Sequence, residues 1–162
     1  MKIVTKSVRE TKKLGQAIAK LIISGKLKKR ILALEGELGG GKTTFLKGFA
    51  KGLGIKERIL SPTFILIRKF KISDSKFKNF YHIDCYRIEK EKEILKLGFK
   101  EIVKNSKNIV AIEWSDKIKN ILPSNVLFLK FEILNAKKRN INISFSKKLR
   151  GSENLIKLIK AK

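Results

Sequence analysis

The chain has 162 residues, a length typical of one domain, and 43% of them are hydrophobic, which is enough for a core at this size. This apolar content and the presence of only 2 prolines argue against a disordered chain. No run of about 18 apolar residues is present, so the sequence offers no membrane span. The single cysteine, Cys85, excludes an internal disulfide. The first six residues are too polar for a signal peptide, and together these features predict a cytoplasmic protein.

The basic charge allows two interpretations. Lysine and arginine outnumber acidic residues by 39 to 14, which gives a formal net charge of +25. Such a charge is typical of proteins that contact nucleic acid or another polyanion. It also arises by mutational drift, because lysine, isoleucine, asparagine and phenylalanine are frequent together in proteins from AT-rich genomes. The basic residues are spread along every segment, which favours drift, although the positive field is expected to attract ATP.

The first half of the chain predicts a strand, a helix, a buried strand and a second helix. Residues 2–6 predict a short edge strand, and residues 11–24 predict a helix with apolar side chains at helical spacing. Residues 30–35 form the short apolar run that is typical of a buried central strand. This run leads directly into a glycine-rich loop, after which residues 43–53 predict the second helix.

The second half predicts two antiparallel hairpins around another buried strand. The predicted elements are a hairpin of 63–72 with 79–84, a short helix at 89–97, a further turn at 102–105, a strand at 108–114, a hairpin of 126–134 with 140–145, and a basic closing helix at about 152–161. The expected fold is one α/β domain over residues 1–162. Its architecture is a P-loop-like three-layer sandwich, with a mixed central sheet that contains antiparallel hairpins.

The glycine-rich loop at residues 36–43, Gly-Glu-Leu-Gly-Gly-Gly-Lys-Thr, fits the P-loop pattern in full. Its glycines let successive backbone N–H groups turn toward phosphate oxygens, and the following helix directs its positive end at the same place. The Lys42 ammonium is expected to reach the β and γ phosphates, and the Thr43 hydroxyl is expected to complete a Mg²⁺ shell. The strand before the loop and the helix after it argue against a chance match. The sequence therefore predicts a site for ATP and Mg²⁺.

Two acids stand at the ends of apolar runs and are candidates for the cation site. P-loop proteins use an acidic residue, often at the end of a neighbouring strand, to hold Mg²⁺. Asp84 ends the run 81–84, and Glu113 ends the run 109–113. An acid at the end of a buried strand carries a desolvation cost and usually has a charged partner. The alternative is that each carboxylate simply reaches solvent, but both are predicted to act at the site.

Three other residues are predicted to have structural roles. His82 is the only histidine, and a lone histidine in a strand is more often packed in the core than used as a ligand. Cys85 is interpreted as a small buried hydrophobe. Trp114 is interpreted as a packing residue rather than a platform for adenine.

Six short motifs along the chain together resemble one known family. They are Glu10-Thr11-x-x-Leu14-Gly15, residues 36–44, Ser61-Pro62-Thr63-Phe64, His82-Ile83-Asp84-Cys85-Tyr86-Arg87, Leu97-Gly98-Phe99 and Ile112-Glu113-Trp114. In this order and at these spacings, the chain resembles the TsaE (YjeE) family from about residue 8 to about residue 146. The P-loop alone would not distinguish this family from other ATPases, whereas the later motifs do.

The resemblance implies an accessory ATPase of tRNA threonylcarbamoyladenosine synthesis. Members of this bacterial family assist a complex of the TsaD and TsaB proteins, in which TsaD modifies adenosine 37 of tRNAs. ATP hydrolysis is expected to reset that complex, so the chain would meet tRNA only through its partners and would not contact a membrane. Because the sequence has no evident arginine finger, we expect slow hydrolysis by the protein alone and activation by its partners.

The resemblance also implies roles for particular residues. Lys42 would act on the phosphates, Asp84 would order the attacking water, and Thr43 and Glu113 would hold the metal. Residues 61–63 would form a switch loop that senses the γ-phosphate. The nucleotide would be bound by Thr11, Glu37, Leu38, Gly39, Gly40, Gly41, Lys42, Thr43, Thr44 and Arg139, with Thr11 and Arg139 near the adenine.

Two other functions remain as alternatives at this point. A small-molecule P-loop kinase would need an arginine-rich lid and an acceptor pocket. The arginines after the P-loop are instead scattered along the chain, at Arg58, Arg68, Arg87 and Arg139. A binding module with a degenerate ATP site is disfavoured because the P-loop lysine and threonine and both candidate acids are intact.

Overall fold

The computed structural model describes residues 1–62, 65–73 and 76–145. The predicted closing helix and Thr63 of the predicted switch loop therefore lie outside the described residues. The strands are β1 (Lys2–Thr5), β2 (Ile31–Gly36), β3 (Ile67–Lys71), β4 (Asn79–Asp84), β5 (Asn108–Glu113), β6 (Val126–Ile133) and β7 (Arg139–Phe145). The helices are α1 (Val8–Ile23), α2 (Lys42–Gly52), α3 (Glu91–Lys96), α4 (Phe99–Lys104) and the short 3-10 helix η1 (Ser115–Ile121).

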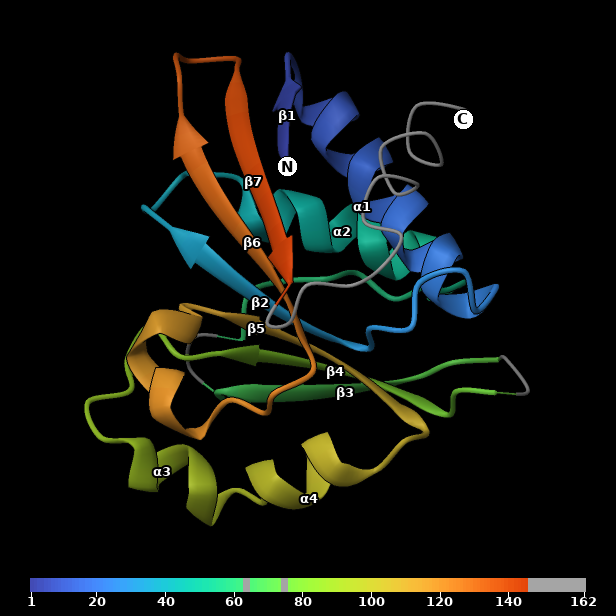
Figure 1. Cartoon of the computed structure of the whole chain (residues 1–162), viewed down its shortest axis with the longest axis vertical. Coiled ribbons are helices and arrows are strands. Elements are labelled where there is room, and N and C mark those ends of the chain that lie inside the picture. Colours follow the sequence, from blue (N-terminus) through green and yellow to red (C-terminus); the bar gives the residue numbers. More distant parts are fainter. Residues whose placement is uncertain (63–64, 74–75, 146–162) are drawn as a thin grey trace.

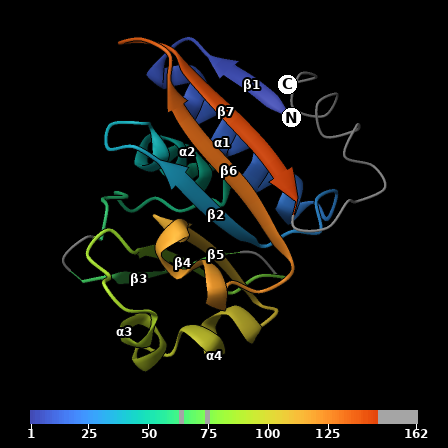
Figure 2. The same ribbon diagram turned by 60° about the vertical axis from the view of Figure 1, so that its left-hand side comes forward.

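In the described residues, seven strands form one mixed sheet in the order β1-β7-β6-β2-β5-β4-β3. The central strand β2 runs parallel to both β5 and β6, and β4 runs parallel to β5. The pairs β1/β7, β6/β7 and β3/β4 are antiparallel. Helices α1 and α2 lie on one face of the sheet and α3 and α4 on the other (Figures 1 and 2). This arrangement confirms the predicted three-layer sandwich with antiparallel hairpins at its margins.

Each face of the sheet has its own apolar layer. On the α1/α2 face, Phe49 of α2 packs against Phe80 of β4 with ring centroids 5.6 Å apart. On the other face, Ile94 of α3 and Phe99 of α4 are fully buried together with Val110 of β5. Because both faces of the central strands are covered, their sequences are continuous apolar runs rather than alternating ones.

The first helix begins earlier than predicted and holds the second in place. It starts at Val8 rather than 11 because the Ser7 side chain caps it, accepting a hydrogen bond from the Glu10 backbone at 3.1 Å. The backbones of α1 and α2 meet closely at Gly48, where an added Cβ would collide with the carbonyl of Lys12. This contact fixes the direction of α2 and hence the position of its N-terminus.

The largest differences from the sequence predictions lie in the peripheral helices. The predicted helix at 89–97 is shorter, and α4 is a full helix where only a turn was predicted. The 3-10 helix η1 was not predicted at all. Strand β3 begins at Ile67 rather than at 63, after Leu66 adopts a left-handed φ of 60°. These segments are short, and their own propensity is weak compared with the packing that positions them.

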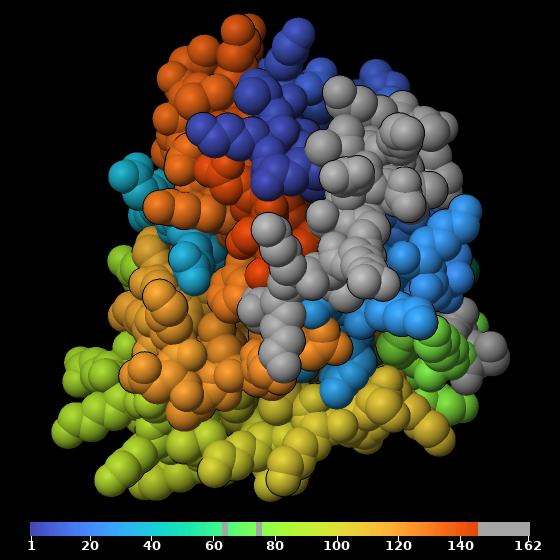
Figure 3. Space-filling view, viewed as in Figure 1, coloured from blue at the N-terminus to red at the C-terminus, as the bar shows by residue number. Residues whose placement is uncertain are grey.

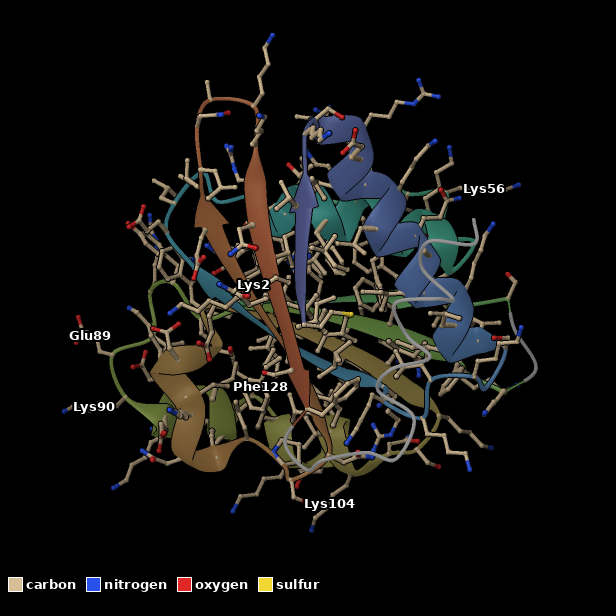
Figure 4. The ribbon with its side chains drawn as sticks, turned by 45° about the horizontal axis from the view of Figure 1, so that its top comes forward. Lys2, Lys56, Glu89, Lys90, Lys104 and Phe128 are labelled. Atoms are coloured by element: carbon tan, nitrogen blue, oxygen red, sulfur yellow. The ribbon has the colours of Figure 1, made fainter. Side chains whose placement is uncertain are left out.

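The surface is basic over several separate regions. Lys56, Lys90 and Lys104 project outward from different parts of the molecule (Figure 4). Residues of α3 and α4 form one end of the surface, and those of β1, β6 and β7 form much of the other (Figure 3). Among the described residues, no helix combines the length and the apolar character needed to cross a membrane.

Candidate nucleotide-binding site

The candidate site lies where three neighbouring parallel strands end. Strands β2, β5 and β4 are adjacent in the sheet, and they end at Gly36, Glu113 and Asp84. In the registers of the sheet, Glu113 lies opposite Leu34 on one side and opposite Asp84 on the other. The carboxyl ends of parallel strands are where open α/β sheets bind ligands. The fold therefore brings both predicted acids and the start of the glycine-rich loop to one edge.

The loop between β2 and α2 has the backbone shape of a phosphate cradle. The loop begins with a turn, which is closed by a hydrogen bond of 3.0 Å from the Gly40 N–H to the Glu37 carbonyl. Gly41 is the N-cap of α2 with a φ of 102°, a left-handed conformation that residues with a side chain rarely adopt. The first N–H groups of α2 have no partner within the helix, and the helix dipole makes this end favourable for an anion.

Lys42 is drawn into the site rather than extended into solvent. It is only 4% exposed, and its Nζ donates to the carbonyls of Gly36 at 2.5 Å and Glu37 at 2.9 Å. The same Nζ lies 3.9 Å from the ring centroid of Trp114. Burial lowers the pKa of Lys42, and the negative charges of Glu113 and Asp84 act in the opposite direction. The ammonium thus braces the loop that a phosphate group would enter.

Glu113 contacts side chains from two other segments of the chain. It is 2% exposed, and the Thr43 hydroxyl lies 3.1 and 3.0 Å from its two oxygens. His82 Nε2 lies 2.8 Å from Oε1 of the same carboxylate. The first turn of α2 and the end of β5 are therefore joined through one carboxylate group.

Asp84 is held separately, at the end of β4. It is also 2% exposed, and its Oδ1 accepts a hydrogen bond of 2.9 Å from the Tyr86 backbone. Its other oxygen accepts a hydrogen bond from the Ser61 hydroxyl. Asp84 thus connects the strand edge to the loop that carries the Ser-Pro-Thr motif.

Two cavities flank the glycine-rich loop. The strand-end cavity has a volume of about 300 Å³ and is lined by Leu38, Gly39, Gly40, Gly41, Lys42, Thr43, Thr44, Ser61, Asp84, Tyr86, Glu113 and Trp114. The hairpin cavity has a volume of about 200 Å³ and is lined by Lys6, Ser7, Val8, Thr11, Gly39, Gly41, Thr44, Ala136, Lys137 and Arg139. Gly39, Gly41 and Thr44 line both, so the loop is a shared wall.

Except for Glu37, every predicted nucleotide-binding residue lines one or both of these cavities. Arg139 donates to the Gly39 carbonyl at 3.1 Å and to the Asn135 carbonyl at 2.8 Å, which ties the β6–β7 turn to the loop. The Thr11 hydroxyl lies 2.8 Å from that of Thr5, and Thr11 is buried beside the hairpin cavity. Glu37 is exposed and lines neither cavity; its contribution in the structure is its carbonyl.

Several lining residues were not selected from the sequence. Tyr86 and Trp114 stand together at the strand-end cavity, with ring centroids 5.0 Å apart. Trp114, interpreted from the sequence as a packing residue, is half-buried and contacts Tyr86 and Lys42 at this cavity. His82 and Cys85 are buried as predicted, but the contact of His82 with Glu113 was missed. The sequence places His82 and Asp84 on one face of a strand, because they are two residues apart, but the contact with Glu113 also depends on the register of β4 against β5.

Comparisons with known proteins agree on one family. A family model described as "Threonylcarbamoyl adenosine biosynthesis protein TsaE" matches residues 5–141. Proteins named "tRNA threonylcarbamoyladenosine biosynthesis protein TsaE" are similar: the one from Rickettsia felis is 38% identical, covering 83% of this chain and 74% of its own length. The one from Treponema pallidum is 31% identical, covering 89% of this chain and 100% of its own length.

A solved structure has the same fold. The crystal structure of YdiB from Bacillus subtilis superimposes with a TM-score of 0.73 and 29% sequence identity, covering 99% of this chain and 94% of that one. The order of motifs, the fold and the matched residues lead to the same conclusion: this chain belongs to the TsaE family, whose members are tRNA threonylcarbamoyladenosine biosynthesis proteins.

Proposed function

We propose that this protein binds and hydrolyses ATP in the cytoplasm as an accessory protein of tRNA threonylcarbamoyladenosine modification, acting on a complex of TsaD and TsaB. One observation carries this proposal. Lys42, Thr43, Asp84 and Glu113 line one cavity at the N-terminus of α2, although they come from three separate segments of the chain. This combination of a loop lysine, a hydroxyl and two carboxylates is the set that phosphoryl transfer requires.

The donor atoms at the strand edge fit a Mg²⁺ ion. The Thr43 hydroxyl and the Glu113 carboxylate are oxygen donors within 3.1 Å of each other, and Mg²⁺ prefers oxygen ligands shared with substrate phosphates. Thr43 and Glu113 would hold the ion, directly or through its water shell. When bound, the ion would neutralise charge on the β and γ phosphates.

The remaining groups act on the nucleotide and on water. Lys42 and the loop N–H groups orient the triphosphate, while Thr11 and Arg139 lie on the side of the loop where the nucleoside would extend. Asp84 accepts a proton from the attacking water or orients it as the bond between the γ-phosphorus and ADP breaks. Its hydrogen bond with Ser61 connects this step to the loop that carries the Ser-Pro-Thr motif, so hydrolysis would change the conformation that this loop presents to a partner protein.

The arrangement also suggests why partners are needed. Among the described residues, Lys42 is the only lysine or arginine that lines the strand-end cavity. Supplying an arginine to the γ-phosphate accelerates hydrolysis by about 10³ to 10⁵ in related enzymes. The mouth of this cavity carries Leu38, which is 75% exposed, and Tyr86, which is 44% exposed. Apolar groups at the mouth suit a protein surface that docks over the nucleotide and completes the site.

A phosphate-release assay tests this function directly. It compares the protein alone, with TsaB, and with TsaB and TsaD together, each with ATP and Mg²⁺. We expect slow release by the protein alone and a large increase only with both partners. Fast release that the partners do not change would contradict the accessory role. Transfer of phosphate to a metabolite instead of water would favour the small-molecule kinase.

A further inference from the structure

His82 is a buried polar residue whose position packing alone does not explain. Its side chain is fully buried, and it lies nearly parallel to the ring of Phe80 with centroids 6.4 Å apart. Phenylalanine or leucine would fill the same place without the cost of burying two ring nitrogens. A functional reason for the imidazole must therefore come from its polar contacts.

The polar contacts of His82 are one-sided. Nε2 lies 2.8 Å from Oε1 of Glu113, whereas Nδ1 has no hydrogen-bond partner among the described residues. A carboxylate oxygen that carries no hydrogen only accepts hydrogen bonds, so the contact is a hydrogen bond to the Glu113 carboxylate when Nε2 carries the hydrogen. Nε2 is thus the one ring nitrogen with a polar contact among the described residues, and its partner is Glu113, the acid proposed to hold Mg²⁺.

Sheet register explains why this contact is geometrically constrained. His82 lies opposite Ala111, and Asp84 lies opposite Glu113, so His82 reaches Glu113 diagonally across two parallel strands. On its other side, Glu113 meets the Thr43 hydroxyl of α2. The carboxylate is therefore held between a strand and a helix, and rotation about its side-chain torsions would break one of the two contacts.

We propose that His82 is the positioning residue of the cation site: its Nε2–H fixes the Glu113 carboxylate in the orientation that meets Thr43, and thereby sets the affinity for Mg²⁺ in the nucleotide complex. This inference rests on the proposed function of the same site. Hydrogen-bond partners behind a metal-binding carboxylate typically contribute about 10- to 100-fold to metal affinity. His82 lines neither of the two cavities beside the loop, so we expect nucleotide binding without Mg²⁺ to be independent of it.

The tautomer of His82 can be measured in the unmodified protein. Because the chain has one histidine, a histidine-labelled sample gives one set of ring signals in an NMR spectrum. We expect the hydrogen on Nε2, and we expect the ring signals to shift when Mg²⁺ is added to the nucleotide-bound protein. A neutral ring with its hydrogen on Nδ1 would overturn the proposal, since Nε2 could not then donate to Glu113.

Two amide substitutions separate positioning from packing. In His82→Gln the amide nitrogen is as many bonds from Cβ as Nε2, whereas in His82→Asn it ends near the place of Nδ1. Both variants bury an amide at the same site, so they form a matched pair. Isothermal titration would measure ADP affinity in EDTA and over a range of Mg²⁺ concentrations. Circular dichroism would check that both variants fold.

We expect His82→Asn to need about 10- to 100-fold more Mg²⁺ for half-maximal effect, with unchanged ADP affinity in EDTA. His82→Gln should restore most of the loss. Equal Mg²⁺ dependence in the two variants, or an equal loss of ADP affinity with and without Mg²⁺, would show that His82 only packs. If neither variant folds, the tautomer in the unmodified protein decides. Failure of the unmodified protein to bind nucleotide would instead refute the proposed function, while the tautomer would still test the His82–Glu113 contact.

Discussion

The two cavities beside the glycine-rich loop differ in charge, burial and origin. The strand-end cavity contains two carboxylates, Asp84 and Glu113, with one ammonium group between them and the loop. The hairpin cavity contains Lys6, Lys137 and Arg139 and no carboxylate among its described lining residues. The first is formed by the ends of central parallel strands, and the second by the N-terminal segment and the turn between the antiparallel strands β6 and β7.

Under the proposed function, this difference would assign catalysis to the strand-end cavity and recognition of the nucleoside to the hairpin cavity. Lys42, Asp84 and Glu113 are at most 4% exposed and are fixed by contacts to two or more segments, so the strand-end cavity is organised before a ligand arrives. Preorganised charge in a water-poor site is the larger contribution to catalysis. The lysines of the hairpin cavity are exposed and can adjust to a ligand. We therefore expect substitutions of the two carboxylates in the strand-end cavity to affect turnover or Mg²⁺ dependence, substitution of Lys42 to affect ATP affinity strongly, and substitutions in the hairpin cavity to affect affinity more weakly.

The largest expected effect is on turnover and comes from Asp84→Asn. A positioned general base contributes about 10² to 10⁴ in rate, so hydrolysis in the presence of TsaB and TsaD should fall by that order while nucleotide affinity is retained.

Glu113→Gln should instead weaken nucleotide binding in the presence of Mg²⁺, because an amide is a poorer partner for the hydrated cation. Single-turnover hydrolysis and titration calorimetry measure the two quantities. If Asp84→Asn abolished binding and Glu113→Gln did not, the two assignments would be exchanged.

Lys42→Ala should weaken ATP binding by about 10- to 100-fold, because charge-assisted hydrogen bonds contribute roughly 1.5 to 3 kcal/mol. From the sequence, this substitution is expected to leave the fold intact, since the lysine faces the ligand. In the structure Lys42 is buried and braces the carbonyls of Gly36 and Glu37, so we also expect a modest decrease in melting temperature. Lys47→Ala, at an exposed position of the same helix, is the matched control. Unchanged ATP turnover in folded Lys42→Ala would contradict the assignment.

Arg139→Ala tests the other side of the loop and should have a smaller effect. The guanidinium is partly exposed, and charged contacts of this kind contribute about 0.2 to 1 kcal/mol, so ATP affinity should fall by about two- to fivefold. The loss should be the same with and without Mg²⁺, because Arg139 is on the cavity without carboxylates. Arg58→Ala, at an exposed position that lines neither cavity, serves as the control. A loss of ATP affinity seen only with Mg²⁺ would show that Arg139 affects the cation site, and the two cavities would then not act independently.

Much of the sheet could be predicted because each central strand is recognisable from its own stretch of sequence. The boundaries of β2 and β5 agree with the predictions within one residue, since buried parallel strands appear as uninterrupted apolar runs. The helices α4 and η1 were not foreseen. They are short, and few buried apolar residues hold them in place: Phe99 and Val103 in α4, and Ile118 in η1. So few apolar residues are too weak a signal without knowledge of the surface that they cover.

The site was predictable to the extent that its residues are neighbours in sequence. The loop, Lys42 and Thr43 follow from one contiguous pattern, and the two acids follow from their places at strand ends. The contact of His82 with Glu113 depends on the register of β4 against β5, and a shift of one residue would turn His82 to the other face. The sequence alone carries no information on register, so it predicts the two acids but not the contact of His82 with Glu113.

The smallest expected effect concerns Cys85, which directly follows Asp84. Its reactivity reports whether solvent reaches the protein interior beside the strand-end cavity. The thiol is fully buried, and this burial, together with the negative charges of Asp84 and Asp116, raises the pKa of Cys85 to about 12. An ordinary thiol has a pKa of about 8.5, and only the thiolate reacts readily. The native protein should therefore show almost no reaction with a thiol reagent.

The pH dependence of that reaction follows from the same shift. Raising the pH from 7 to 9 increases the thiolate fraction of an ordinary cysteine many-fold, but it leaves a thiol with a pKa of about 12 neutral. Labelling of the native protein should thus stay low across this range, and one thiol should become reactive when urea is added. Because burial is the largest cause of the shift, Asp84→Asn should leave Cys85 protected even while it removes turnover. Rapid labelling of the native protein at pH 8 would mean that the strand-end side opens to solvent, and the contrast in rigidity between the two cavities would not hold.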